Sequence, residues 1–143
     1  TKTWDQFPRG DAPLTLLREQ TERDITSLDS AVADRDASAA RDAALRVAQD
    51  QLDLRSRHQP VADTELARMR LWARQVVLDA DAHDLAAVLG DVATLEWTFD
   101  RVRDTVANPG AVDRDLTTMR KAAHAKHFTA ATSAADQLLT RLE

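Results

Sequence analysis

The 143-residue chain contains no cysteine and few glycine, proline or aromatic residues: three glycines, four prolines, three tryptophans, three phenylalanines and no tyrosine. The absence of cysteine excludes disulfides, a thiolate nucleophile and cysteine-based zinc sites. The three glycines are isolated, so the chain has no glycine-rich loop that would bind phosphate, and it has no nucleophile elbow. We therefore expect a protein that is not an enzyme and that needs no organic cofactor.

Basic residues are outnumbered by acidic ones, 19 to 24, which gives a net charge of −5, and neither sign forms a long block. A nucleic-acid partner requires a basic face, so we expect no nucleic-acid binding. No hydrophobic run approaches the roughly 20 residues of a membrane span, so we also expect no membrane span. The chain begins with Thr1 instead of methionine. We expect a processed or trimmed product, which leaves an extracytoplasmic location open.

What the sequence does contain is helical periodicity. Seven apolar residues recur at spacings of three and four, which places them in one stripe along one side of a helix: Leu85, Val88, Val92, Leu95, Phe99, Val102 and Val106. The preceding segment, 66–78, is apolar over a wider arc, which predicts neighbours on two sides. We expect these two helices to form the centre of the fold.

Helix-breaking residues divide the chain into segments. The expected helices cover residues 13–33, 37–57, 63–78, 85–106 and 113–143, and the last segment is either one helix or two. Residues 1–12 carry Trp4, Phe7 and Pro8 without helical periodicity, so we expect an extended N-terminal arm. Residues 13–143 are expected to form a single all-α domain, long enough to bury one core.

An internal comparison predicts how these helices pair. With Asp36, His83 and His127 placed in register, at offsets of 47 and 44 residues, small residues coincide after each of three turns. They are Ala39, Ala86 and Ala130; Ala40, Ala87 and Ala131; and Ala43, Gly90 and Ala134. Small residues at such positions let two helices approach closely. The pattern predicts five to six helices in three successive antiparallel hairpins, and a break of the last segment near Lys126.

The small residue after each turn, at Ala40, Ala87 and Ala131, resembles tetratricopeptide-like hairpins. This sequence departs from that family because its period is longer, no proline ends each unit, and the small and aromatic positions of the first helix are not met. The resemblance implies a hairpin array, and the other arrangement open to the same helices is a compact bundle. No functional residue is carried over from the family.

Three residues of segment 66–78 form one candidate binding site. Arg70 and Arg74 are four apart and share a helix face, beside Trp72. Two guanidinium groups at this spacing can clamp an anionic group, and a tryptophan can stack on it. The alternative is structural: the arginine stems cover apolar surface, and Trp72 occupies a core position equivalent to Ile25 and Leu116.

Histidines supply a second candidate site. His83 and His127 are expected at hairpin turns on the same edge, His124 lies three residues before His127, and Asp81 lies near His83. Imidazole and carboxylate groups at such spacing can bind a divalent metal. The chain lacks, however, the Glu-x-x-His and His-Glu-x-x-His patterns of known metal sites, and turn histidines are commonly caps or solvated groups.

The function we expect is a non-enzymatic helical scaffold that binds a protein or peptide partner through a groove lined by the inner helices. The alternative is an extracytoplasmic bundle that binds a divalent metal or small ligand through its turn histidines and aspartates.

Glu96, beside the apolar stripe, is either a partly buried carboxylate or the partner of an arginine.

Overall fold

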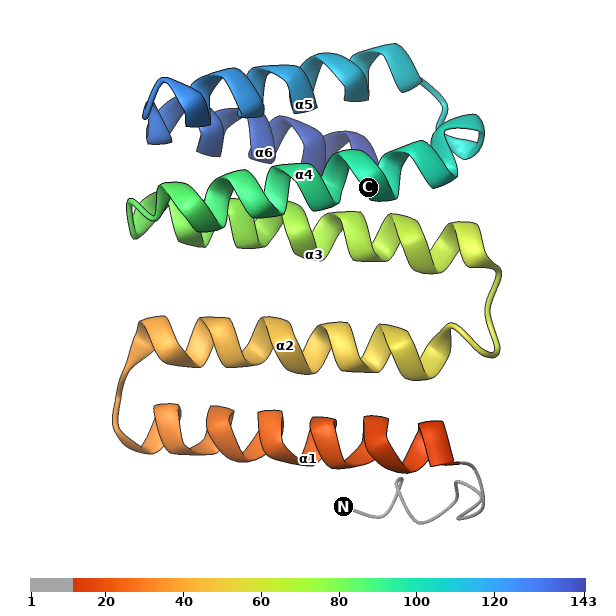
Figure 1. Cartoon of the computed structure of the whole chain (residues 1–143), viewed down its shortest axis with the longest axis vertical. Coiled ribbons are helices and arrows are strands. Elements are labelled where there is room, and N and C mark those ends of the chain that lie inside the picture. Colours follow the sequence, from red (N-terminus) through yellow and green to blue (C-terminus); the bar gives the residue numbers. More distant parts are fainter. Residues whose placement is uncertain (1–11) are drawn as a thin grey trace. The chain divides into compact units, whose positions relative to one another are not determined.

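A computed structural model of the chain describes residues 12–143, and these residues contain α-helices and one short 3-10 helix but no strand (Figure 1). The helices are α1 (Ala12–Ala33), α2 (Ala37–Arg55), α3 (Val61–Asp81), α4 (Leu85–Val102), η2 (Arg103–Thr105), α5 (Pro109–His124) and α6 (Phe128–Leu142). The all-α prediction is confirmed. The predicted N-terminal arm lies outside the described residues, apart from its last residue, which begins α1.

The predicted break in the last segment is confirmed, because α5 ends at His124 and α6 begins at Phe128. The start of α5 is earlier than expected. Asn108 caps this helix by accepting a hydrogen bond from the Ala111 N–H (3.1 Å), and Pro109 is its first residue. Proline is tolerated at this position because its missing N–H would have no partner within the helix. Pro109, a residue type that breaks helices in their interior, therefore begins one here.

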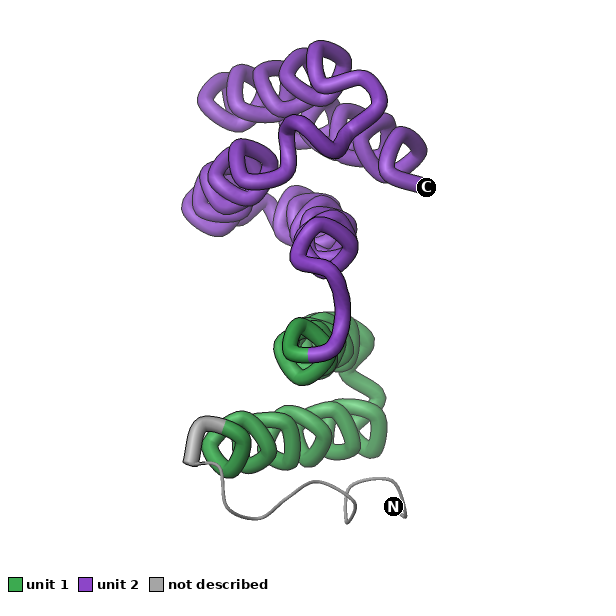
Figure 2. Tube along the Cα trace, turned by 90° about the vertical axis from the view of Figure 1, so that its right-hand side faces the viewer, with its two compact units in different colours: residues 1–57 green, residues 58–143 purple. Residues whose placement is uncertain are grey.

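The chain divides into two compact units, residues 1–57 and residues 58–143 (Figure 2), and the expected single domain for 13–143 stays a prediction. In the described part of the first unit, α1 and α2 pack against each other as an antiparallel hairpin. An ion pair joins them, with the Arg46 guanidinium 3.0 Å from the Asp24 carboxylate.

The second unit is a closed bundle of four helices. Here α3 packs against α4 and α6, and α5 packs against α4 and α6, so each helix has two main neighbours. Figure 2 shows these helices as two layers, α3 with α4 and α5 with α6. In a hairpin array the first helices of successive hairpins would be the main neighbours instead. The bundle alternative therefore holds for residues 58–143.

The core of this bundle contains the predicted stripe of α4. Val88, Val92, Leu95, Phe99 and Val102 are all at most 2% exposed. Met69 of α3, Met119 of α5 and Leu138 of α6 meet them and are completely buried. The helix itself ends at Val102, so Val106, which we expected in the same helix, lies beyond η2 and is half-buried against the core.

The three hairpins turn with the same backbone geometry. The second residue after the end of each first helix is left-handed and is not glycine: Arg35 (φ 57°), His83 (φ 58°) and Lys126 (φ 57°). The next N–H donates to the carbonyl five residues back: Asp36 to Ala31 (2.9 Å), Asp84 to Asp79 (2.9 Å) and His127 to Ala122 (2.8 Å). This is the Schellman arrangement that ends many helices. Equivalent positions in the hairpins can therefore be counted from these left-handed residues.

Counting from the turns corrects the register of the middle hairpin by one residue. The residue of the middle hairpin that is equivalent to Asp36 and His127 is Asp84, not His83. Ala73, which is fully buried, then takes the place of Ile25 and Leu116 that we had expected for Trp72. The sequence repeat itself stays a prediction, but the three turns give the hairpins a common frame.

The left-handed turns predict a stabilising substitution. Lys126→Gly is expected to raise the free energy of unfolding by roughly 0.5–1 kcal/mol, because the left-handed conformation is unfavourable for a residue with a Cβ atom. The matched control is Lys121→Gly inside α5, which is expected to lower it by about 1 kcal/mol. Urea denaturation of both variants measures these changes. A loss of stability in Lys126→Gly would contradict the turn geometry.

Candidate interaction surface

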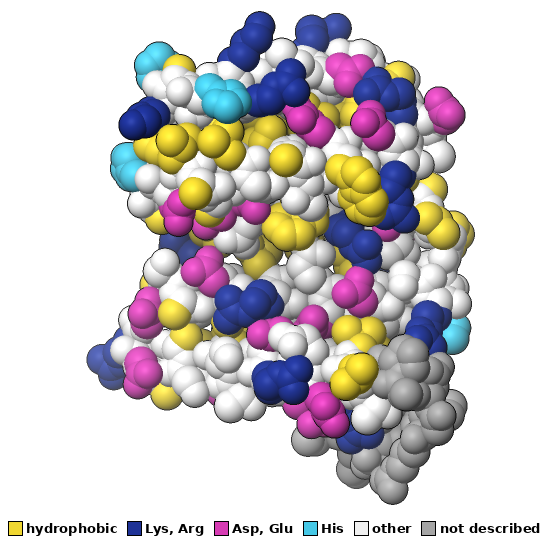
Figure 3. Space-filling model, viewed as in Figure 1, with side chains coloured by type: hydrophobic (Ala, Val, Ile, Leu, Met, Phe, Trp, Pro, Cys, Tyr) yellow, Lys and Arg dark blue, Asp and Glu magenta, His cyan; other side chains and the backbone are white. Residues whose placement is uncertain are grey.

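The side of α4 that faces away from the core is exposed and uncharged over most of its length. Ala86, Gly90, Ala93 and Trp97 follow one another at spacings of four, three and four residues, and all are exposed. We call these four residues the α4 outer strip. Between Asp84 and Asp100 no exposed residue of the helix is charged. On the face shown in Figure 3, hydrophobic side chains gather over α4, with acidic and basic side chains around them.

Trp97 has the largest side chain of this strip, and the residue is 60% exposed. The Arg101 guanidinium carbon lies 4.7 Å from the centre of the ring, close enough for a cation–π contact. Arg101 also lies 3.4 Å from the carboxylate of Glu65 on α3, which is only 4% exposed and is paired with Arg68 at 3.1 Å. A buried carboxylate thus holds the arginine that lies against the exposed ring.

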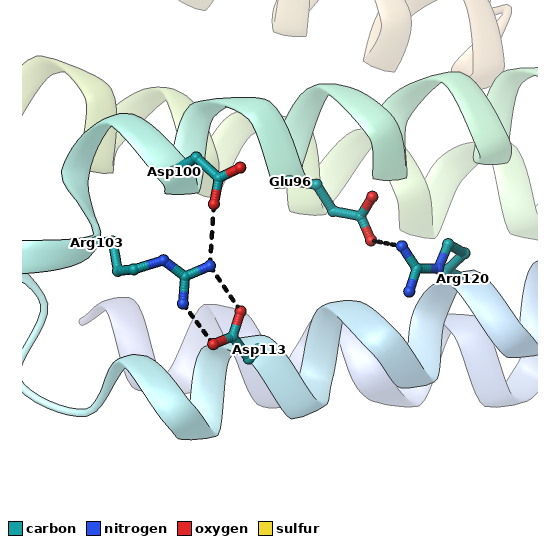
Figure 4. Close-up of polar contacts among 5 residues, drawn as sticks. All are labelled: Glu96, Asp100, Arg103, Asp113 and Arg120. Atoms are coloured by element: carbon teal, nitrogen blue, oxygen red, sulfur yellow. Dashed lines mark hydrogen bonds and ion pairs between the residues drawn. The ribbon is translucent and has the colours of Figure 1, made fainter.

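The opposite edge of α4 is fixed against α5 by ion pairs (Figure 4). Glu96 of α4 and Arg120 of α5 are 2.9 Å apart, which confirms the arginine partner that we considered for Glu96. Arg103 donates to both oxygens of Asp113 (2.5 and 3.0 Å) and to Asp100 (2.9 Å). Its hydrogen bonds hold the pKa of Asp113 below the usual value. These groups, three carboxylates and two guanidinium groups, line a shallow hollow of about 240 Å³. Their effect is to fix the orientation of α4.

The predicted anion clamp on α3 stays a prediction, but one of its two arginines already has a partner. Arg70 donates from both Nε (2.7 Å) and a terminal nitrogen to the carbonyl of Leu142, the last residue of α6. The last carbonyls of a helix lack partners within the helix, so a neighbouring guanidinium satisfies them. Trp72 is half-buried and packs against the core. Arg74 is the one exposed residue of these three, and no side chain within residues 12–143 pairs with it.

Two of the predicted metal ligands do lie together. His83 and His127 line one hollow of about 530 Å³ with Lys126 and Phe128, and the His83 and Phe128 rings meet edge to face at 4.9 Å. The expectation that both histidines lie on the same edge is therefore confirmed. His124 and Asp81 are exposed and do not line this hollow.

No three histidine or acidic side chains in the described part of the chain are grouped so as to hold a metal ion. Lys126, the neighbour of the two histidines, also adds a positive charge to the same hollow. The metal-binding alternative stays a prediction for which the described residues offer no ligand cluster.

Carboxyl groups buried between helices were not expected from the sequence. Asp50 is 8% exposed and lies beside Asp24 in the first unit, and Asp91 is 7% exposed and lies beside Asp79 in the second. Burial, together with the neighbouring Asp24, raises the pKa of Asp50 from 3.8 to about 6. Burial, together with a hydrogen bond to Asp79, raises the pKa of Asp91 from 3.8 to about 8. The first pair therefore keeps a proton up to about pH 6 and the second up to about pH 8, where an exposed aspartate would have released it.

No family model, curated protein or solved structure matches this chain. None of the described helices is both long enough and apolar enough to cross a membrane.

Proposed function

We propose that the protein is a non-enzymatic helical scaffold that binds a protein or peptide partner, and that the α4 outer strip is the surface of contact. The observation that carries this proposal is the 60% exposure of Trp97 at the end of a helix face without charged residues. A surface helix ordinarily presents charged or polar residues to water. The centres of protein interfaces are instead depleted of charge and enriched in tryptophan and arginine.

The surroundings of Trp97 favour binding over incidental exposure. Truncation of an interface residue has its largest effects at tryptophan, tyrosine and arginine, and here a tryptophan and an arginine are adjacent. Arg101 is already held by Glu65, and it lies against the indole ring in the free protein. Less side-chain freedom is then lost when a partner binds, which favours affinity. Asp100 and Arg101 supply a polar edge at one end of the strip.

The shape of this surface indicates the kind of partner. A groove lined by the inner helices was expected from the sequence, but the proposed surface is the outer side of a single helix. Gly90 and Ala93 leave the helix backbone accessible between Ala86 and Trp97. A partner that fits such a surface presents an apolar groove or a pocket that accepts the indole, in the manner of helix-in-groove recognition.

Trp97→Ala is expected to weaken binding of such a partner at least about 30-fold, the size of effect that defines a strong interface residue. The matched control is Leu16→Ala on α1, which removes another side chain that is 67% exposed and lies outside the strip. Proteins captured from native cells by the wild-type chain are compared with those captured by each variant. For each protein that the wild-type chain captures and Trp97→Ala does not, the affinity for both chains is then measured with purified components.

The proposal is supported when one protein binds wild type and Leu16→Ala alike but is lost from Trp97→Ala. It is contradicted when every protein that binds the wild-type chain binds Trp97→Ala with the same affinity. Circular dichroism of the variant verifies that its helices are intact, which the exposure of Trp97 leads us to expect.

A further inference from the structure

Asp79 and Asp91 occupy positions at which the other two hairpins have alanines. Counted from the left-handed turn residues, the equivalent pairs are Ala31 with Ala43 and Ala122 with Ala134. These four alanines are at most 8% exposed. Two small apolar side chains are therefore sufficient for this contact between the helices, and the architecture does not require a pair of carboxyl groups here.

The hydrogen bonds of the pair show where its proton lies. Gln75 donates from its side-chain amide to both oxygens of Asp79, at 3.1 Å each, so both oxygens of Asp79 act as acceptors. An ionised carboxylate only accepts hydrogen bonds, so a hydrogen bond between two carboxyl groups requires a proton on one of them. Asp91 has a buried oxygen, Oδ2, with no partner among the ordinary donors. Asp91 is thus the protonated acid that donates to Asp79.

Nothing that acts on Asp91 compensates a negative charge there. The charged groups that act on it are Asp79 of α3 and Asp84 at the start of its own helix, and both are acidic. The basic residues at this end of the bundle, in α5 and in the turn between α5 and α6, are exposed, and none contributes to the charge environment of Asp91. They are Lys121, His124, Lys126 and His127. Loss of the proton would leave two adjacent negative charges between α3 and α4.

We propose that the Asp79–Asp91 pair is a pH-sensitive contact: a shared proton holds the first half of α4 against the end of α3, and loss of that proton releases it. The raised pKa of Asp91, about 8, agrees with this geometry. The folded hairpin binds the proton more tightly than the unfolded chain, whose aspartates titrate near 3.8. The contribution of the pair to the stability of the hairpin is therefore complete below about pH 4 and is lost progressively as the pH rises toward about 8.

Hydrogen–deuterium exchange of the full chain tests this contact. Protection factors of the amides in 85–92 are measured at about pH 5 and about pH 8 and are corrected for the intrinsic effect of pH on exchange. One proton can raise the opening equilibrium by at most tenfold per pH unit. We expect the wild-type protection factors to fall by at least about tenfold over this range, and those of Asp91→Asn to change by less than about threefold. The asparagine amide donates to Asp79 at every pH.

Two further variants make the test specific. Asp50→Asn removes the carboxyl of similar burial in the first unit and should leave the pH dependence at 85–92 unchanged. The double variant Asp79→Ala with Asp91→Ala reproduces the alanine pairs of the other hairpins and should fold with protection that is insensitive to pH. The proposal is overturned if wild-type protection does not change with pH, if Asp91→Asn changes as much as wild type, or if the double variant does not fold.

Discussion

Phe99→Ala is expected to lower the free energy of unfolding of the 58–143 unit by about 3–5 kcal/mol, the usual effect of emptying a large core site. Phe99 is 1% exposed and lies in the core cluster with Leu95 and Leu116. Trp97→Ala, two residues away, is expected to lower it by less than about 1 kcal/mol, because the indole is mostly solvated and loses one cation–π contact. The larger of the two aromatic side chains should therefore matter much less for stability.

Denaturant unfolding of the two variants, monitored by circular dichroism, measures this difference. The comparison bears on function because Trp97 is free to bind a partner only if α4 is oriented with Phe99 inward. A loss in Trp97→Ala as large as that in Phe99→Ala would place the indole in the core and remove the proposed surface. Arg101 keeps its ion pair with Glu65 in the Trp97 variant, so the neighbouring charge remains paired.

Arg141→Met is expected to lower the free energy of unfolding by about 2–3 kcal/mol. Removing one partner of a buried ion pair commonly costs 3–5 kcal/mol, and we expect somewhat less because the Arg141 side chain is 42% exposed. Its Nε lies 2.6 Å from the carboxylate of Asp115, which is 4% exposed. Methionine preserves part of the apolar stem of the arginine, so the loss reports mainly the carboxylate left without its partner.

The control is the double variant Asp115→Asn with Arg141→Met, in which no buried charge is left alone. We expect it to recover most of the stability that Arg141→Met loses. Urea denaturation near neutral pH is the measurement. A loss below about 0.5 kcal/mol in Arg141→Met would show that water solvates Asp115 well and that the pair behaves as a surface ion pair.

The same two positions explain the acid pair of the first unit. Counted from the turns, Asp24 and Asp50 are equivalent to Asp115 and Arg141. The α1–α2 hairpin therefore has a second acid where the α5–α6 hairpin has a cation. Arg46 pairs with Asp24 from another position of α2, at 3.0 Å. Asp24 keeps a lowered pKa because hydrogen bonds from Gln20 and Arg46 outweigh its burial, while Asp50 remains beside it with a raised one.

The helices and the core were predictable because burial follows the helical period. The spacing of Val88, Val92 and Leu95 predicts which side of α4 is buried, and these residues are at most 1% exposed. The same spacing places Trp97 off the stripe, so its exposure was available from the sequence. The break near Lys126 was predicted from the comparison of hairpins, since the segment itself contains no breaker.

The register error has a physical cause. A left-handed residue after a helix is most often glycine, but Arg35, His83 and Lys126 take this conformation here. No glycine marked these positions, so the histidines His83 and His127 were aligned with each other although they lie one residue apart in the turn geometry. The assignment of Trp72 to a core position failed for the same reason.

Contacts between distant segments were beyond the reach of the sequence pattern. The hydrogen bond from Arg70 to Leu142 joins residues 72 positions apart, and it depends on where α6 ends beside α3. The Asp79–Asp91 pair joins two helices that are consecutive in the chain, α3 and α4, and Asp91 lies next to Val92 on the inner side of α4. A polar residue beside an apolar stripe was the signal that would have revealed this pair.

A photo-reactive amino acid at position 93 tests most directly whether the α4 outer strip binds a partner. Ala93 is exposed in the middle of the strip, and Thr118, exposed on α5, provides the control position. Irradiation of native cells that make each variant is predicted to attach one protein covalently at position 93 but not at position 118, and Trp97→Ala in the same chain should abolish the attachment. The proposed function is contradicted if position 93 captures nothing, or if the same proteins are captured at position 118 and persist in the Trp97 variant.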